Sequence, residues 1–193
     1  MEDLNIYCIA HAIRENDWAH GKLRELRSIL DKNRITTTSP KLGNHVTLIP
    51  PFRTTEAAAK LLAWGLDYWD TVRLGSVQEH DKYFGAIATG FEFFEGDEGD
   101  AFIVQLRVDS HLTRAVERGR KKIPEIAEWV HIKNYDFNPH ITVAEGKGLA
   151  ESVRRLISTG KLPRHYMDSF SISFEVPRVF RKNLLMHRWE PVG

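Results

Sequence analysis

The sequence predicts an α+β protein built from two related halves, each with its own antiparallel sheet. Two short strands carry the same pattern of His, apolar, Thr, apolar, over His45–Leu48 and over His140–Val143. A helical pattern follows each strand after a short connection, and hairpin patterns surround both. No Gly- or Ser-rich linker separates the halves. We therefore expect a single domain of two intertwined lobes over residues 1–193.

Composition and charge limit the classes of function. The chain of 193 residues is long enough to bury a real core, and its 42% hydrophobic and 27% charged residues are typical of a soluble globular protein. The net charge of +1 does not favour a nucleic-acid coat or a membrane-surface protein, so any contact with a phosphate chain must come from a local patch. The single cysteine, Cys8, excludes an internal disulfide and a four-cysteine zinc site. Its apolar neighbours indicate a buried structural thiol.

The N-terminal residues indicate a cytoplasmic protein. The segment Met1-Glu2-Asp3 carries two acidic residues where a signal peptide would be basic. No apolar run approaches the roughly 20 residues that a membrane span needs. We expect a monomer with no membrane partner.

The first quarter of the chain alternates between strand and helix patterns. Leu4–Ile13 reads as a strand, and Asp17 is a good N-cap for a helix over Trp18–Asn33. Residues 35–43 form a polar loop before the first His-x-Thr strand. Thr55 caps a second helix. The apolar stripe of that helix consists of Ala58, Leu61, Leu62, Trp64 and Leu66.

The middle of the chain predicts three strands and a helix. The strands are Thr71–Val77, Phe84–Phe94 and Ala101–Val108, and the acidic turn over residues 95–100 joins the last two as a hairpin. A third helix begins at Asp109 or Ser110 and runs toward Trp129. Pro124 is expected to break or kink it.

The end of the chain predicts one more helix and three strands. After the second His-x-Thr strand, Leu149–Thr159 is a short helix that ends at Gly160. Phe170–Phe174 alternates as a strand. A closing hairpin, Val176–Phe180 with Leu184–Trp189, turns around Lys182 and Asn183.

The His-x-Thr strands place two polar groups together. Side chains alternate along a strand, so His45 and Thr47 share one face while Val46 and Leu48 point to the other. The second motif repeats this arrangement. Each strand therefore buries an apolar face and presents an imidazole beside a hydroxyl.

Two imidazoles that face each other across a cleft are suited to acid–base chemistry. An unperturbed histidine pKa is about 6.5, so one ring can be neutral and the other protonated near pH 7. One ring takes a proton from an attacking oxygen and the other gives one to the departing oxygen. The hydroxyls hydrogen-bond the non-bridging oxygens of a phosphate in the transition state. This pattern favours cleavage of a phosphodiester. The reaction requires no metal, and the sequence has no cluster of carboxylates that would hold a metal ion.

Chance is the alternative explanation of such short motifs. A third one, His111-Leu112-Thr113, follows Asp109-Ser110 at the predicted start of a helix. Residues i and i+2 do not share a face of a helix, so we interpret this motif as accidental. A lone strand histidine is usually structural. Two in matching strands favour a function.

The two motif strands resemble those of the 2H phosphoesterase superfamily. Its members include bacterial 2′-5′ RNA ligases and 2′,3′-cyclic nucleotide phosphodiesterases, and His-Val-Thr-Leu-Ile-Pro-Pro-Phe is especially similar to the ligase-like branch. The resemblance implies a bilobal fold in which two antiparallel sheets face a central cleft, with helices on the outside. It also implies that no cofactor is needed. The catalytic residues that it implies are His45, Thr47, His140 and Thr142.

The resemblance leaves the substrate open. Substrates of the family are RNA-terminal 2′,3′-cyclic phosphates, 2′-5′ linkages, small cyclic phosphates and, in some phage members, cyclic oligonucleotide signals. This chain has a long segment over residues 71–100 that is richer in aromatic residues than a minimal member needs. That difference concerns the substrate and not the chemistry.

Two further groups are candidate substrate-binding residues. The aromatic group can stack a base or pack in the core, and consists of Phe52, Tyr135 and Phe137. The basic group can form a local positive patch or remain solvated surface charge, and consists of Arg53, Lys147, Arg178 and Arg181.

Several functions remain open. We favour a phosphodiesterase that acts on a nucleotide or an RNA end. The same site can run the reverse, RNA-joining reaction, and only an assay separates the two directions. A phage-type enzyme that degrades cyclic oligonucleotides is a further alternative. A nucleotide-binding module without turnover is the least favoured, because all four motif residues are intact.

Overall fold

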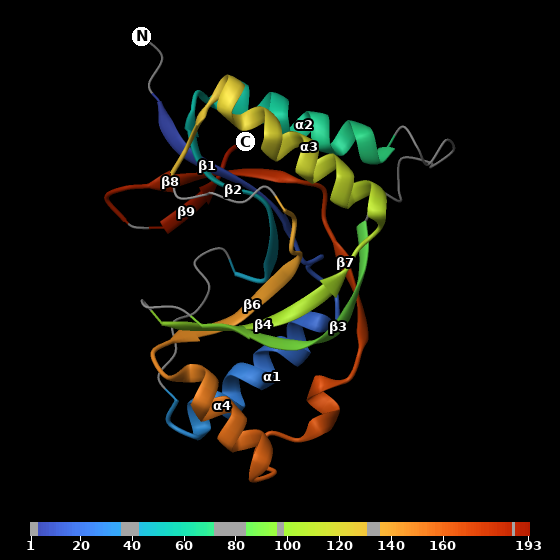
Figure 1. Cartoon of the computed structure of the whole chain (residues 1–193), viewed down its shortest axis with the longest axis vertical. Coiled ribbons are helices and arrows are strands. Elements are labelled where there is room, and N and C mark those ends of the chain that lie inside the picture. Colours follow the sequence, from blue (N-terminus) through green and yellow to red (C-terminus); the bar gives the residue numbers. More distant parts are fainter. Residues whose placement is uncertain (1–3, 36–42, 72–83, 96–98, 131–135, 187) are drawn as a thin grey trace.

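The computed structural model describes residues 4–35, 43–71, 84–95, 99–130, 136–186 and 188–193. Within these ranges the strands form two antiparallel sheets, which lie one above the other in Figure 1 with helices on their outer sides. The α+β class with two antiparallel sheets is therefore confirmed.

Sheet A has the strand order β5-β2-β1-β8-β9. The helices α2, Glu56–Thr71, and α3, Ser110–Ile126, pack against each other and cover one face of it. The strands of sheet A are β1 (Asn5–Ala12), β2 (His45–Thr54), β5 (Glu128–Trp129), β8 (Arg178–Asn183) and β9 (Arg188–Pro191).

Sheet B has the strand order β6-β4-β3-β7. The helices α1, Ala19–Lys32, and α4, Leu149–Ser158, cover its outer face (Figure 1), where α1 contacts β6 and α4 contacts β4. A short 3₁₀ helix over Arg164–Met167 follows α4. The strands of sheet B are β3 (Phe84–Phe94), β4 (Asp100–Arg107), β6 (His140–Gly146) and β7 (Phe170–Phe174).

Helices α1 and α3 each pack on the sheet that does not contain the strand preceding them in sequence. Helix α1 follows β1 of sheet A and precedes β2, yet packs on sheet B. Helix α3 follows β4 of sheet B, yet packs on β2 of sheet A. This exchange of helices connects the two sheets.

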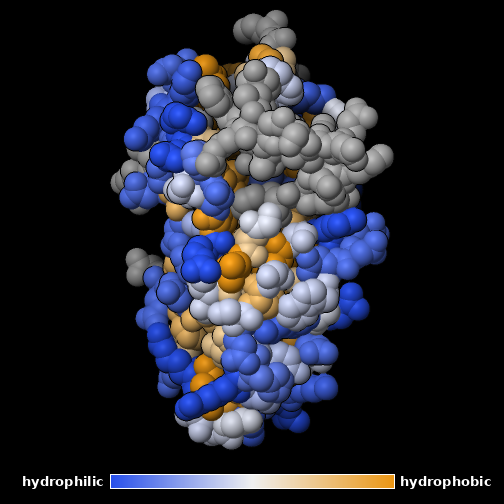
Figure 2. Space-filling model, turned by 90° about the vertical axis from the view of Figure 1, so that its right-hand side faces the viewer, coloured by the Kyte–Doolittle hydropathy of each residue, from blue (hydrophilic) through white to orange (hydrophobic). Residues whose placement is uncertain are grey.

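The core lies between each sheet and its helices. Val46 and Leu48 of β2 and Ile141 and Val143 of β6 are wholly buried in one continuous apolar cluster. Cys8 is also buried, and burial raises the pKa of its thiol well above the usual range, as expected for a structural cysteine. On the side of the molecule seen in Figure 2, apolar atoms are visible in the middle, between hydrophilic flanks. In the described part of the chain, no helix has both the length and the apolar character to cross a bilayer.

The structure bears on two expectations about helices, a break at Pro124 and the apolar stripe of α2. Pro124 does not break α3, which continues to Ile126, because the wholly buried Ile123 anchors the last turn and accepts a hydrogen bond from the Ala127 N–H at 2.7 Å. In α2, Leu61 and Trp64 are exposed rather than buried. The helix is rotated so that its core side consists of Ala59, Ala63 and Leu66. The strand expected over Thr71–Val77 lies outside the described residues, except for Thr71, which ends α2.

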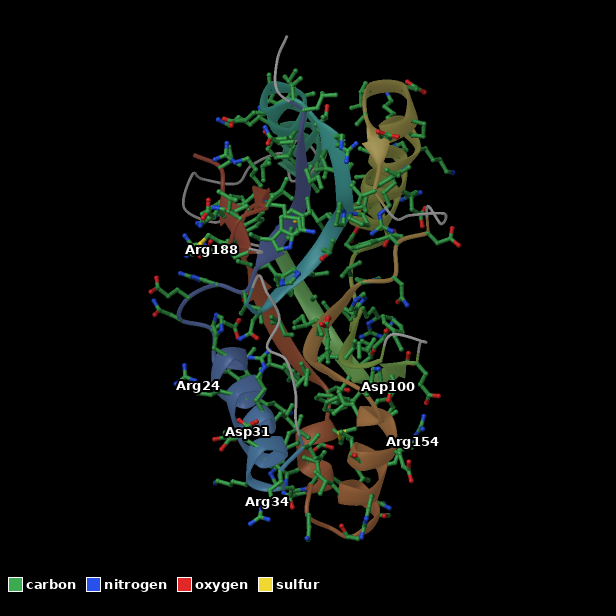
Figure 3. All side chains as sticks on the ribbon, turned by 90° about the vertical axis from the view of Figure 1, so that its left-hand side faces the viewer. Arg24, Asp31, Arg34, Asp100, Arg154 and Arg188 are labelled. Carbon is green, nitrogen blue, oxygen red and sulfur yellow. The ribbon has the colours of Figure 1, made fainter. Side chains whose placement is uncertain are left out.

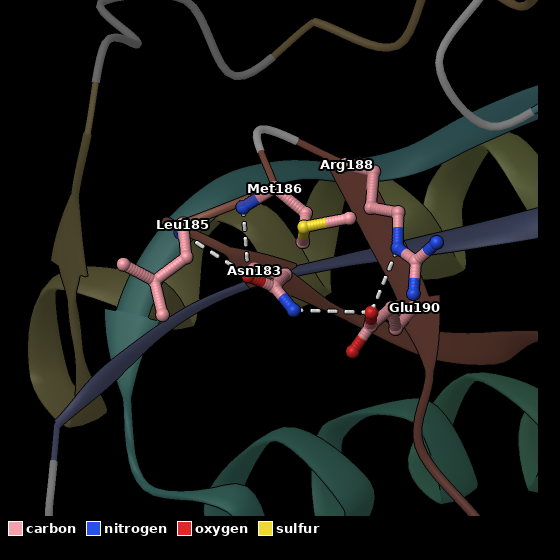
Figure 4. Close-up of polar contacts among 5 residues, drawn as sticks. All are labelled: Asn183, Leu185, Met186, Arg188 and Glu190. Atoms are coloured by element: carbon pink, nitrogen blue, oxygen red, sulfur yellow. Dashed lines mark hydrogen bonds and ion pairs between the residues drawn. The ribbon is translucent and has the colours of Figure 1, made fainter.

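The turn of the last hairpin is shifted from its expected place at Lys182–Asn183. The strand β8 extends to Asn183, and the turn follows it. The Asn183 side chain organises this turn, because its Oδ1 accepts from the N–H groups of Leu185 at 3.1 Å and Met186 at 3.0 Å (Figure 4). Its Nδ2 donates to Glu190 at 3.1 Å across the hairpin.

The contact between α3 and its neighbours is close enough to require glycine. A Cβ at Gly119 would lie 3.3 Å from Leu66 Cδ2 and 3.5 Å from Ile49 Cδ1. We expect Gly119→Val to lower the free energy of unfolding by about 1–3 kcal/mol, because the added methyl groups overpack this contact. Urea unfolding measures it. As a control, Gly21→Ala in α1 meets nothing within 4 Å and should raise stability by about 0.5–1 kcal/mol. If Gly119→Val did not lower the free energy of unfolding relative to Gly21→Ala, the packing around Gly119 would be loose.

Candidate active site

The two motif histidines begin neighbouring strands of different sheets. His45 is the first residue of β2 and His140 the first of β6, and these strands contact each other where the two sheets meet. Because Val46 and Leu48 are buried on the helix side, His45 and Thr47 face away from α3 and toward sheet B. The Nε2 of His45 and the Oγ1 of Thr47 are 3.2 Å apart, so they share a face as the motif predicts.

Both imidazoles are held in the same way by the backbone. The Nδ1 of His45 lies 2.9 Å from the carbonyl oxygen of Gly43, and the Nδ1 of His140 lies 2.8 Å from that of Asn138. A carbonyl oxygen only accepts hydrogen bonds, so each Nδ1 carries a proton and donates it. The Nε2 is therefore the nitrogen that gains and loses a proton on each ring.

Burial and charge oppose protonation of both rings. Loss of water lowers the pKa of His45, as does the charge of the neighbouring His140, while the Gly43 carbonyl raises it. Loss of water also lowers the pKa of His140, together with the charge of Arg120, while the Asn138 carbonyl raises it. Lowered pKa values favour the neutral form of both rings at pH 7, and the charge effect of His140 on His45 agrees with the contact between β2 and β6.

The sequence analysis did not identify three residues that surround His140, which are Gln105, Asn138 and Phe94. Gln105 of β4 lies directly opposite His140, and its Nε2 donates to Asn138 Oδ1 at 2.6 Å. The ring of Phe94 meets the imidazole edge to face at 4.8 Å between centroids. The sheet register places Gln105 of β4 opposite His140, whereas Phe94 of β3 lies opposite Ala101 and meets the imidazole only through its side chain. Neither contact is visible from spacing in the sequence.

The aromatic candidates pack in the interior instead of facing the histidines. Phe52 is wholly buried, with its ring 6.5 Å from that of Tyr7 in the core of sheet A, so base stacking by Phe52 is corrected to core packing. Phe137 is also buried, and the Arg120 guanidinium lies over its ring at 5.2 Å. Its role is therefore corrected to packing as well. Tyr135 lies outside the described residues.

Of the basic candidates, Arg178 is on the face of the motif. It lies opposite Ala10 of β1, which in turn lies opposite Thr47, and its guanidinium pairs with Glu175 at 2.6 Å. Arg181 lies opposite Tyr7 on the α2 side of the sheet, so its expected place in the patch is wrong.

The other two basic candidates are solvated. Arg53 is exposed and pairs with Glu128 of β5 at 3.8 Å. Lys147 is exposed in the turn after β6. The basic candidates thus do not form one patch.

The third motif lies where the helix pattern placed it. His111 and Thr113 are in the first turn of α3, where the Asp109 side chain accepts from the His111 N–H at 2.7 Å. The Thr113 hydroxyl donates to the Asp109 carbonyl at 3.3 Å. Elsewhere in the described ranges, no three His, Cys, Asp or Glu side chains gather closely enough to hold a metal ion.

The arrangement of two antiparallel sheets with helices on their outer sides is also found in a solved structure. The Escherichia coli protein LigT, solved in complex with 3′-AMP, has this fold. Its structure matches with a TM-score of 0.50 over 99% of this chain and 96% of that chain, at 10% identity. The predicted fold is therefore confirmed.

Two further solved structures are similar over most of their length. One is described as a phosphoesterase, with a TM-score of 0.48 and 13% identity over 99% of this chain and 97% of that chain. The other is Usb1 of Kluyveromyces marxianus, with a TM-score of 0.46 and 11% identity over 92% of this chain and 93% of that chain. No family model and no curated protein matches the sequence.

The charge interaction between the rings predicts a measurable shift. We expect His140→Gln to raise the pKa of His45, because a protonated His140 no longer opposes a proton there. Titration of the imidazole signals by NMR measures this. His165→Gln, at an exposed residue of the 3₁₀ helix, is the control and should leave His45 unchanged. An unchanged pKa of His45 in His140→Gln would show that the rings are not neighbours in solution.

Proposed function

We propose that the protein is a metal-independent phosphodiesterase that acts on a nucleotide or RNA phosphodiester, such as a 2′,3′-cyclic phosphate or a 2′-5′ linkage. The observation that carries the proposal is the pair of imidazoles at the junction of β2 and β6. On each ring the backbone fixes the proton on Nδ1 and leaves Nε2 to exchange protons. On this proposal, His45, Thr47, His140 and Thr142 are the catalytic residues.

The reaction needs one proton to be taken and one to be given. With a 2′,3′-cyclic phosphate, the Nε2 of a neutral ring takes a proton from water, and the water oxygen forms a bond to phosphorus. The bond from phosphorus to one ribose oxygen breaks, and the protonated ring gives its proton to that oxygen. The Thr47 and Thr142 hydroxyls donate to the non-bridging oxygens, where negative charge increases.

Binding of the substrate favours formation of the acid, which is a protonated imidazole. Both rings have lowered pKa values and are neutral at pH 7 without a ligand. A phosphodiester carries a negative charge, and an anion between the rings favours protonation of one of them. Binding of the anion therefore creates the pair of one neutral and one protonated imidazole that the reaction requires.

Nucleotides are the first substrates to test. The complex of LigT with 3′-AMP concerns a protein of the same fold, and a nucleotide fits the local features of this site. The Phe94 ring beside His140 can stack a base, and Arg178 lies on the same face as Thr47.

An RNA-joining activity at the same site is the second candidate. If a ribose 5′-hydroxyl replaces water as the nucleophile, the same two rings carry out the same proton transfers. A turnover screen against 2′,3′-cyclic mononucleotides, RNA ends with a cyclic phosphate, and cyclic dinucleotides, with and without an acceptor RNA, separates hydrolysis, joining and degradation of cyclic oligonucleotides. Binding without turnover of any of them would indicate a nucleotide-binding module.

Loss of either imidazole should remove turnover and preserve the fold. We expect His45→Ala and His140→Ala each to lower kcat by about 10²–10⁴-fold, because each removes one proton transfer. Both residues face away from the core, so the unfolding midpoint should change little. Steady-state kinetics in the presence of a chelator measures the effect. A near wild-type rate in either variant would refute the two-histidine mechanism.

The threonines distinguish the two motif strands from the accidental motif. We expect Thr47→Ala and Thr142→Ala to lower kcat by up to about 10²–10³-fold, because each removes a donor to the phosphate oxygens. Thr113→Ala is the matched control, because its hydroxyl bonds to its own helix. A slow Thr113→Ala beside a normal Thr142→Ala would mean that the wrong second motif is paired with His45.

A further inference from the structure

A half-buried arginine on α1, Arg27, connects β6 with the segment that leads into β2. The Nε of Arg27 donates to the Val143 carbonyl at 2.7 Å, and its Nη2 lies 3.3 Å from the Thr142 carbonyl. The same Nη2 donates at 2.7 Å to Oδ1 of Asn44, the residue immediately before His45. One guanidinium therefore contacts β6 of sheet B and the segment that leads into β2 of sheet A.

An arginine on α3 does the same from the other side. Arg120 is 6% exposed, and its Nε donates to the Leu48 carbonyl at 2.8 Å. Its Nη1 donates to the carbonyl of Asp136, in the segment that leads into β6. This guanidinium contacts β2 of sheet A and the approach to His140.

The two arrangements correspond position by position. Val143 is three residues after His140, and Leu48 is three residues after His45. In both cases Nε bonds to the carbonyl at that position, and a terminal nitrogen bonds to the segment before the other histidine. The helices that carry the arginines are the two exchanged between the halves of the chain.

Asn44 is itself oriented by a second histidine. The Nε2 of His20 lies 3.3 Å from the Ile13 carbonyl and donates to it, so Nδ1 accepts from Asn44 Nδ2 at 2.9 Å. This contact fixes the amide with its Oδ1 toward Arg27. The link from Arg27 to the start of β2 is therefore held from both sides.

Burial of these charges is costly, so the contacts must offset that cost. Loss of water lowers the pKa of Arg27, and it lowers the pKa of Arg120 to about 10. The planar guanidinium can donate in two directions at once, whereas a lysine ammonium is a compact point charge on a flexible stem. Simultaneous contacts with one motif strand and with the segment that leads into the other strand therefore favour arginine over lysine.

We propose that Arg27 and Arg120 are a matched pair of positioning residues that set His45 and His140 against each other across the two sheets. Their effect on turnover rests on the proposed function, whereas their effect on the distance between the rings does not. A misplacement of about 1 Å can cost about 10²-fold in rate. The pair therefore fixes the geometry that proton transfer at both ends of one phosphodiester requires.

The test uses Arg27→Lys and Arg120→Lys, which keep the positive charge and lose the planar guanidinium with its two directions of hydrogen bonding. Matched controls are Arg24→Lys on α1, which points outward in Figure 3, and Arg114→Lys, exposed near the start of α3. With the preferred cyclic-phosphate substrate, we expect kcat to fall by about 10²-fold in the two test variants with KM nearly unchanged, and no change in the controls.

A second measurement does not depend on turnover. The rise in the pKa of His45 on replacement of His140 by Gln reports the proximity of the rings, because charge interactions weaken with distance. We expect this rise, measured by NMR, to shrink when Arg27→Lys or Arg120→Lys is also present, and to persist in the Arg24→Lys and Arg114→Lys backgrounds. Should no substrate be turned over, the NMR result alone decides the proposal.

Asn44→Ala covers the case in which the lysine variants do not fold. It removes the contact of Arg27 with the lead-in to His45 and keeps those with β6. In this variant, too, we expect the rise in the pKa of His45 on replacement of His140 by Gln to shrink. An unchanged coupling in the folded variants, with or without a fall in rate, would overturn the positioning role.

Discussion

Leu48 and Val143 are wholly buried, and the position of the chemistry in this molecule depends on that burial. A slip of one residue in β2 or β6 would turn these side chains away from the helices and bury His45 or His140 in the core. Exposing a leucine-sized side chain costs about 1.5–3 kcal/mol, and desolvating an imidazole adds to that cost. The register that forms the core is therefore the one that presents the imidazoles and hydroxyls between the sheets.

Burial of the apolar side chains determines which face of β2 and of β6 presents the motif residues. The packing of α1 on sheet B and of α3 on sheet A then orients these two faces relative to each other. In this fold α1 packs on β6 and α3 on β2, so each helix is shared between the halves. Arg27 and Arg120 use this arrangement, because each reaches a motif strand under its own helix and the approach to the other one. The interlocked topology thus also provides contacts between the half-sites.

Features that depend on neighbours in the sequence could be predicted, and features that depend on contacts between distant segments could not. The motif strands were predicted because alternation along a strand is local, and the helix start at Asp109 because its cap is local. The buried side of α2 was not, because it depends on how that helix packs against α3. Gln105 and Phe94 reach His140 from other strands, which no spacing in the sequence indicates. Four other residues were misassigned or overlooked for one reason: the sequence does not reveal how deeply a given Phe or Arg is buried. They are Phe52, Phe137, Arg27 and Arg120.

The electrostatics of the junction explain how a chain with a net charge of +1 can serve an anionic substrate. Burial, mutual repulsion and the charge of Arg120 all disfavour the imidazolium forms, and the Gly43 and Asn138 carbonyls only partly oppose this. An anion between the rings reverses the balance at one of them, since it favours the protonated form more strongly in a partly dehydrated site than in water. On the proposed function, selectivity for a phosphodiester would come from the coupling of anion binding to protonation at the two Nε2 atoms. A broad basic surface is not needed, which agrees with the scattered positions of Arg53, Lys147 and Arg178.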